Sequence, residues 1–167
     1  GMIQVQELAT MRPGEVTAMR GCDLDMTGDV WVYVPESHKT EHHGRDRTIF
    51  IDRGAQELLR PFLKTDPQAF LFSPADARRE FDEQRKANRK TPMTPSQQAR
   101  QRKAKPKKQP GKKYTTASYG YAIRKACKLA DIPNWAPNQL RHNGATEVNR
   151  EHGIDGTRAV LGHLSAN

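Results

Sequence analysis

The sequence has few of the features that hold a chain in a membrane or cross-link it covalently. Its longest apolar run is the five-residue stretch 30–34, whereas a membrane-spanning helix needs roughly 20 apolar residues. The first twenty residues carry four charges, so we expect no secretory signal among them. The two cysteines, Cys22 and Cys127, are far apart and stand in no CxxC or Cys/His spacing, which argues against a disulfide framework or a zinc module. We therefore expect a chain from a reducing, cytoplasmic compartment.

Acidic residues are scarce in one segment, and that segment carries the net charge of the chain. The 167 residues sum to +9. Residues 76–113 hold 14 Lys and Arg against 4 Asp and Glu, while the other 129 residues hold 14 against 15. Such runs are often only solvated loops. An excess this concentrated favours a polyanionic partner, with nucleic acid first and an anionic membrane surface second.

Local patterns predict one mostly helical domain with a small antiparallel sheet. Helices are expected at 3–10, from Arg12-Pro13 onward, and at 53–64, 74–90, 115–130, 138–151 and 154–161. Strands are expected at 30–34 and 48–51, which are rich in β-branched and aromatic residues, and at 70–72. The polar stretch between the first two strands contains Lys39 and predicts a long turn or an intervening short strand.

Residues 91–113 form a segment with almost no apolar side chains. It contains four prolines, and its only apolar side chains other than proline are Met93, Ala99 and Ala104. This composition buries too little surface to offset the entropy of ordering, so we predict a flexible basic loop. The basic residues of this loop, which we expect to bind DNA, are Arg100, Arg102, Lys103, Lys105, Lys107, Lys108, Lys112 and Lys113.

Three short motifs stand far apart in the chain. They are Met11-Arg12-Pro13-Gly14-Glu15, Asn138-Gln139-Leu140-Arg141-His142 and Leu161-Gly162-His163. Together they resemble the catalytic domain of the tyrosine recombinases, the phage-integrase family. That family has an arginine at an Arg-x-Gly-Glu helix start, a lysine in a β-hairpin turn, an arginine in His-x-x-Arg and a histidine in Leu-Gly-His.

The resemblance implies a fold and an activity. The fold is α+β and mostly helical, the tyrosine-recombinase DNA breaking-rejoining fold with a small antiparallel sheet. Residues 1–167 are expected to be a partial integrase catalytic domain with a basic, flexible insertion at about 76–113. The implied activity is site-specific DNA recombination or integration through a 3′-phosphotyrosyl intermediate. It needs no metal and no other cofactor.

Site residues follow from the same resemblance, one by one. Arg12 corresponds to the first arginine, Lys39 to the hairpin lysine, Arg141 to the second arginine and His163 to the Gly-His histidine. Two guanidiniums suit the negative charge that grows on phosphate oxygens during attack on a phosphodiester. A lysine is able to protonate the departing 5′ oxygen, and a histidine adds a further donor to the phosphate.

The sequence departs from the family pattern at two points. Asn138 stands at the position of the family histidine, and an amide donates a hydrogen bond but does not act as a base near neutral pH. The family tyrosine follows Leu-Gly-His, and no tyrosine stands among the four residues after His163. The four tyrosines of the chain, at positions 33, 114, 119 and 121, all precede Arg141. We therefore expect none of them to take the place of the family tyrosine. We expect a fragment of a longer enzyme that binds DNA and does not cut it.

Plainer explanations exist for several of these residues. Arg12 alone would be interpreted as a surface partner of Glu15, and Lys39 as a solvated lysine. Glu15 itself is expected to anchor a helix start or to pair with a neighbouring cation. His38 and His42 are four residues apart, but this spacing aligns side chains on a helix and the segment is typical of a turn, so no metal site is assigned. His142 is expected to turn about 100° away from Arg141 and to make a structural hydrogen bond.

Three functional hypotheses remain open at this stage. The first is a recombinase that binds double-stranded DNA, self-associates on it and sits with the nucleoid in a prokaryote, with no membrane partner. The second is a non-catalytic DNA-binding protein that retains the same fold, which Asn138 and the missing tyrosine favour. The third is a basic RNA-binding protein unrelated to integrases, which predicts that Arg12, Arg141 and His163 lie scattered over the molecule.

Overall fold

The computed structural model describes residues 1–36, 47–100 and 109–162. The expected class is confirmed, since most of the chain is helical and one small antiparallel sheet accompanies the helices. The helices are α1 Met2–Leu8, α2 Pro13–Ala18, α3 Arg53–Leu59, α4 Pro74–Ala87, α5 Pro95–Gln98, α6 Thr116–Ala130 and α7 Asn138–Leu161, with 3-10 turns η1 Gly21–Asp23 and η3 Arg60–Phe62. The strands are β1 Leu24–Asp25, β2 Trp31–Tyr33 and β3 Ile49–Ile51.

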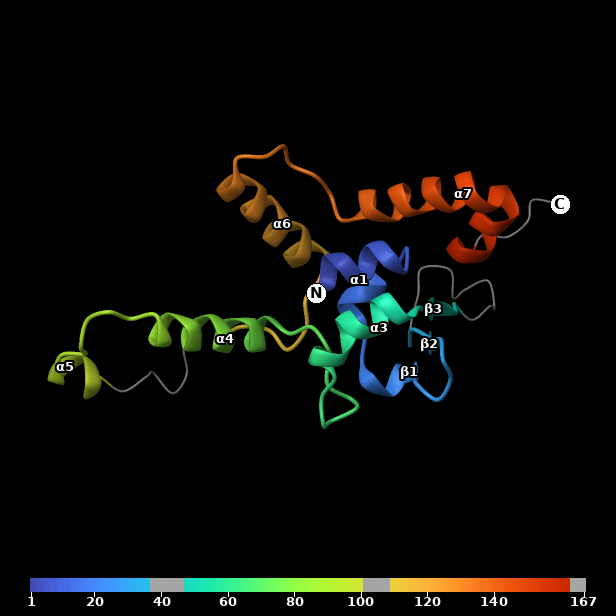
Figure 1. Ribbon diagram of the computed structural model, residues 1–167. Coiled ribbons are helices and arrows are strands. Elements are labelled where there is room, and N and C mark those ends of the chain that lie inside the picture. The colour runs from blue at the N-terminus through green and yellow to red at the C-terminus, as the bar shows by residue number, and fades with distance from the viewer. Residues whose placement is uncertain (37–46, 101–108, 163–167) are drawn as a thin grey trace.

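One face of the three-stranded sheet packs in the hydrophobic core. Its order is β1-β2-β3, and both pairings are antiparallel. Trp31 faces Ile51 and Tyr33 faces Ile49, and all four are buried, whereas Phe50 on the opposite side is exposed. This alternation follows from the two-residue period of a strand. The core continues into α1, α2, α3 and α6. Figure 1 shows α1 and α3 between the sheet and the other helices of the body.

α1 fixes where α7 begins and how closely it approaches. The buried Gln6 side chain donates from Nε2 to the carbonyl of Pro137, immediately before α7, at 2.8 Å. Further along α7, a methyl group added at Gly144 would lie 2.7 Å from Thr10 Oγ1. Gly144 therefore allows α7 to lie directly against the turn that leads to Arg12.

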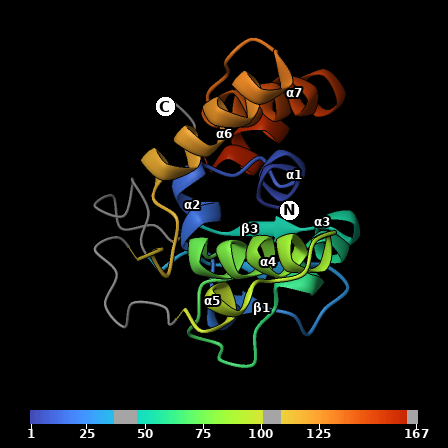
Figure 2. The same cartoon turned by 90° about the vertical axis from the view of Figure 1, so that its left-hand side faces the viewer.

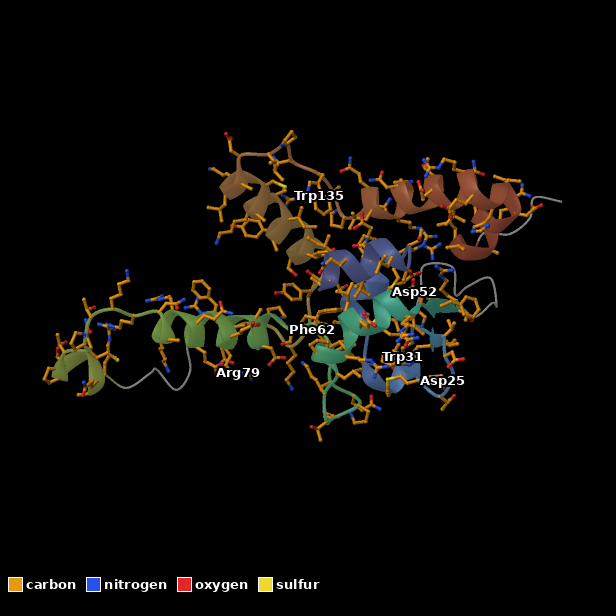
Figure 3. The ribbon with its side chains drawn as sticks, in the orientation of Figure 1. Asp25, Trp31, Asp52, Phe62, Arg79 and Trp135 are labelled. Atoms are coloured by element: carbon orange, nitrogen blue, oxygen red, sulfur yellow. The ribbon has the colours of Figure 1, made fainter. Side chains whose placement is uncertain are left out.

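α4 and α5 form an arm that extends away from the body of the molecule (Figure 1). No residue of α4 is buried, and Ser73 caps its first turn by accepting from Asp76 N. At the base, Phe62 and Phe72 pack with ring centroids 4.9 Å apart, and Lys64 Nζ lies 2.5 Å from Asp76 Oδ2. Figure 3 shows Phe62 where the arm meets the body and Arg79 further along α4. Seen from the side of the arm, α4 runs across the view in front of the sheet (Figure 2).

Two local expectations differ from the structure. Residues 70–72 make no strand, since Phe70 forms only an isolated antiparallel bridge with Arg20, and α4 begins soon after at Pro74. The segment 91–113, expected to lack regular structure, contains the one-turn helix α5, which starts at a proline as helices often do. Gly111 accepts a backbone hydrogen bond from Ala75 at 3.2 Å, which holds the returning chain at the base of the arm. Within the described ranges, no helix has the length and apolar character needed to cross a membrane.

Candidate functional site

Glu15 organises the start of α2. Its carboxylate accepts the backbone N–H of Arg12 at 2.7 Å and Arg12 Nη1 at 2.9 Å. Pro13 occupies the first helical position, where a missing N–H costs nothing. The Glu15 side chain is 3% exposed, so its charge is compensated almost entirely by protein groups. The expected role of Glu15 as helix anchor and cation partner is confirmed.

Arg141 is buried and joins two distant segments. Its Nη1 donates to the carbonyl of Thr10 at 2.9 Å, and its Nη2 donates to the carbonyl of Leu161 at 2.8 Å. Thr10 adopts a left-handed conformation with φ of 52°, which ends α1 and directs its carbonyl away from the helix. Arg141 thus connects the residue that precedes Met11-Arg12 to the end of α7.

Arg12 and Arg141 line the same cavity, of about 290 Å³. The other residues around it are Pro13, Asn138, His142, Ala145 and Leu161. Asn138 Nδ2 lies 2.9 Å from His142 Nε2, one helical turn further along α7. The expected hydrogen bond of His142 is present. His142 also lines the cavity, because residues four apart share a helix face and Asn138 lies on the same wall.

Arg47, which sequence reasoning missed, is a third guanidinium close to this site. Its side chain is 4% exposed, its Nε lies 3.4 Å from Glu15 Oε1, and its Nη1 donates to the carbonyl of Val160 at 3.0 Å. Its Nη2 is buried and has no hydrogen-bond partner among the described residues. The only indication of Arg47 in the sequence was its position directly before the strand 48–51. A buried arginine at such a position cannot be told from a solvated one, because basic residues are common beside polar turns.

Burial has the largest effect on the pKa values of the two buried arginines of the site, and the neighbouring charges come second. Burial, followed by the charge of Arg12, lowers the pKa of Arg141 to about 10. Burial also lowers the pKa of Arg47, partly offset by Glu15, while Arg12 lowers it further. Both guanidiniums keep their charge at neutral pH. Three cations therefore gather around one carboxylate in the part of the chain that the structure describes.

Several predicted site residues lie outside the described residues. These are Lys39, His163, Arg102, Lys103, Lys105, Lys107 and Lys108. The structure does describe three of the predicted DNA-binding residues, Arg100, Lys112 and Lys113. All three are exposed, and none of them lines the cavity. Lys113 Nζ lies 5.1 Å from the centroid of the Phe70 ring at the base of the arm.

The other side chains that the structure describes add neither a metal centre nor a tyrosine at the cavity. Among the described residues, no group of three His, Cys, Asp or Glu side chains could hold a metal ion. Tyr33 and Tyr119 belong to the core, and burial raises the pKa of both hydroxyl groups, to about 12 for Tyr119. None of the four tyrosines lines the cavity.

A second, larger hollow of about 990 Å³ lies along the arm. It is lined by Arg78, Asp82, Arg85, Lys86, Arg89, Thr91, Met93 and Gln97. Arg89 connects residues on the wall of this hollow, because its guanidinium donates to the Thr91 carbonyl and to Gln97 Oε1, both at 2.8 Å. No acidic residue occurs from 84 to 130, so the far half of the arm carries only positive charge.

Comparison with solved structures connects this fold to DNA recombinases. The pre-cleavage complex of the site-specific recombinase XerH bound to its difH substrate is similar with a TM-score of 0.55 at 15% identity, over 98% of this chain and 39% of that chain. The post-cleavage complex of XerH with a palindromic difH substrate gives a TM-score of 0.54 at 14% identity, over 98% and 38%. No family model and no curated protein matches the sequence. The chain has the fold of a site-specific recombinase, over about two fifths of the length of XerH.

Proposed function

We propose that this chain is the DNA-binding catalytic portion of a site-specific recombinase that breaks and rejoins DNA through a 3′-phosphotyrosyl intermediate. The observation that carries the proposal is the gathering of Arg12, Arg47 and Arg141 around the single carboxylate of Glu15 beside a cavity. Buried charge is costly unless it is paired, and two positive charges remain in excess. A phosphodiester supplies the missing negative charge.

Arg12 and Arg141 act as the phosphate clamp in this proposal. Attack on phosphorus places growing negative charge on the non-bridging oxygens, and a guanidinium binds such oxygens through directed, charge-assisted hydrogen bonds. Arg141 is held by two carbonyls, so its position is set before DNA arrives. Arg12 is 20% exposed and is held on one side only, by Glu15, which leaves further N–H groups for the phosphate.

The proposed reaction is a pair of transesterifications. The hydroxyl oxygen of a tyrosine attacks phosphorus and its proton passes to solvent, while the bond from phosphorus to the 5′ oxygen breaks and that oxygen takes a proton from Lys39. His163 donates a hydrogen bond to the phosphate. A 5′ hydroxyl of a second strand then attacks phosphorus and returns its proton to Lys39, and the released tyrosine oxygen takes a proton from solvent. Lys39 and His163 take these roles from the resemblance, since both lie outside the described residues.

Double-stranded DNA is the proposed partner of the arm and of the basic segment. The hollow lined by Arg85, Lys86 and Arg89, together with Arg100, Lys112 and Lys113, presents positive charge outside the phosphate site. Contacts of this kind bind phosphates without reading base sequence. Strand exchange joins DNA strands from two duplexes, so we also propose that several copies of the protein assemble on DNA.

One observation favours a second candidate, a DNA-binding protein that has lost the reaction. Asn138 occupies the family histidine position, and its amide is already engaged with His142. A protein of this kind retains the cavity and its affinity for phosphate and forms no covalent bond to DNA.

The test is covalent capture on nicked duplexes tiled across the DNA that flanks the coding sequence. Two proteins are compared, namely the 167-residue chain and a version extended through the codons that follow. We expect an adduct from the extended protein only, because the resemblance places the tyrosine after His163. The adduct disappears when that tyrosine becomes Phe, and Arg12→Ala or Arg141→Ala lowers its yield at least a hundredfold.

Two outcomes would redirect the assignment. DNA binding by the extended protein without any adduct would establish the second candidate. An adduct formed by the 167-residue chain itself would show that another nucleophile serves, and the assignment of site residues would then be wrong.

A further inference from the structure

Arg47 is a buried cation that belongs to none of the three motifs. It stands just before β3, and its guanidinium bridges two other parts of the fold. Nε is 3.4 Å from Glu15 Oε1 in α2, and Nη1 donates to the carbonyl of Val160 near the end of α7 at 3.0 Å. A side chain that is 4% exposed and absent from the cavity wall has no direct access to a phosphate there.

The end of α7 is held by two arginines from different elements. Arg47 binds the carbonyl of Val160, and Arg141 binds the carbonyl of Leu161 at 2.8 Å. The last carbonyls of a helix have no partner within the helix, and cations are favourable there. These two hydrogen bonds therefore fix the direction in which the chain leaves α7, one residue before His163.

Gly162 shows that the fold makes room for Arg47. A methyl group added at Gly162 would lie 2.8 Å from Arg47 Nη1. Gly162 also has a φ of 61°, in the left-handed region that glycine adopts without strain. The glycine of Leu-Gly-His is thus required by its backbone conformation and by the guanidinium packed against it.

We propose that Arg47 is a positioning residue of the phosphate site, which orients Arg12 through Glu15 and the end of α7 through the Val160 carbonyl. The inference rests on the proposed function, because the site it serves is the phosphate clamp. Glu15 Oε1 is shared by Arg12 and Arg47, so removal of Arg47 leaves this oxygen with Arg12 as its described partner, and the Arg12 guanidinium loses the restraint that Arg47 imposed through the carboxylate. The other oxygen stays bound to the backbone N–H of Arg12. The same removal releases one of the two carbonyl groups that arginines hold at the end of α7.

The test uses the 167-residue chain with Arg47→Lys, which keeps the charge and removes the ability to reach Glu15 and Val160 at once. Arg53→Lys is the matched control, since Arg53 is 91% exposed and does not line the cavity. The first measurement is the affinity for inorganic phosphate, from nuclear magnetic resonance shifts of the Arg141 side chain at constant ionic strength. The second is hydrogen exchange of the Gly162 amide, which donates to Ala159 O, without phosphate.

Arg47→Lys is expected to weaken phosphate binding at least fivefold and to speed Gly162 exchange at least tenfold, with α6 amides unchanged. Arg53→Lys changes neither. In Arg47→Ala, added guanidinium ion is expected to restore part of the phosphate affinity. Wild-type affinity and wild-type exchange in Arg47→Lys would overturn the proposal. If the wild-type chain binds no phosphate, the proposed function fails, and the exchange of Gly162 still decides whether Arg47 holds the end of α7.

Discussion

Arg141 and Leu161 are twenty residues apart on α7, yet Arg141 Nη2 donates to the Leu161 carbonyl at 2.8 Å. A straight helix would separate them by about 30 Å. Gly153 makes the hydrogen bond possible, because its φ of 69° and ψ of −170° break the helix and turn the chain back. Figure 1 shows the last turns of α7 returning beneath its first part.

Gly153→Ala is expected to destabilise the protein by about 1–3 kcal/mol, because this backbone conformation is essentially confined to glycine. A methyl group at Gly153 meets nothing within 4 Å, so the whole effect comes from the backbone. Urea unfolding measures it. Gly28→Ala is the control, since Gly28 does not have a positive φ and its added methyl group makes an ordinary contact. Equal stability of the two variants would show that α7 does not depend on the break.

Inorganic phosphate is expected to raise the melting temperature of the chain above that in sodium chloride of equal ionic strength. An anion that binds only the folded state stabilises it by mass action. Arg12→Ala should abolish this increase while changing the stability without phosphate by less than about 1 kcal/mol, since the partly exposed pair with Glu15 is worth little. The Glu15 carboxylate still accepts the backbone N–H of residue 12 in that variant, so this part of the α2 cap is kept. An undiminished phosphate effect would exclude Arg12 from the anion site.

The base of the arm is expected to weaken in acid. A hydrogen bond from Lys64 lowers the pKa of Asp76, so the contribution of this pair is present above the unfolded-state pKa of 3.8 and is lost as the pH falls through the lower folded-state value. Asp76→Asn should therefore be less stable than wild type at pH 6, and the difference should shrink as the pH falls below 3.8. Urea midpoints at several pH values measure it. A difference that is constant with pH would contradict an ionic role for Asp76.

The basic segment is expected to supply salt-dependent affinity for duplex DNA. Replacing the eight basic residues from Arg100 to Lys113 by Gln should flatten the slope of log affinity against log salt by about 0.9 for each DNA phosphate that these side chains neutralise. Substitution is preferable to deletion, because it keeps the Ala75–Gly111 backbone hydrogen bond at the base of the arm. A control with Arg53 and Arg150 replaced by Gln should retain the wild-type slope. An unchanged slope in the eightfold variant would assign the affinity to another surface.

Local sequence signals predicted much of the secondary structure for a simple reason. Capping, proline position and strand alternation act between residues that are close in the chain, as at Pro13 and Glu15 or at Ser73 and Pro74. Burial of individual side chains within a helix is harder to predict from the sequence, because it depends on which other segments pack against that helix. On α6, Tyr119, Ile123 and Cys127 are buried, whereas Ala126 and Ala130 at the far end of the same helix are exposed in the described part of the chain.

The sequence by itself determined most of the helices, two of the three strands, the concentration of basic charge and the three motifs that carry Arg12, Arg141 and Gly162. Only the tertiary structure decided which other groups join them. Arg47 has no distinguishing pattern in the sequence, and its meaning depends on hydrogen bonds with Glu15, 32 residues before it, and Val160, 113 residues after it. A buried guanidinium loses its hydrating water and needs oxygen atoms of the protein as hydrogen-bond acceptors instead. Those acceptors come from segments distant in the sequence, so only the packing of the folded chain supplies them.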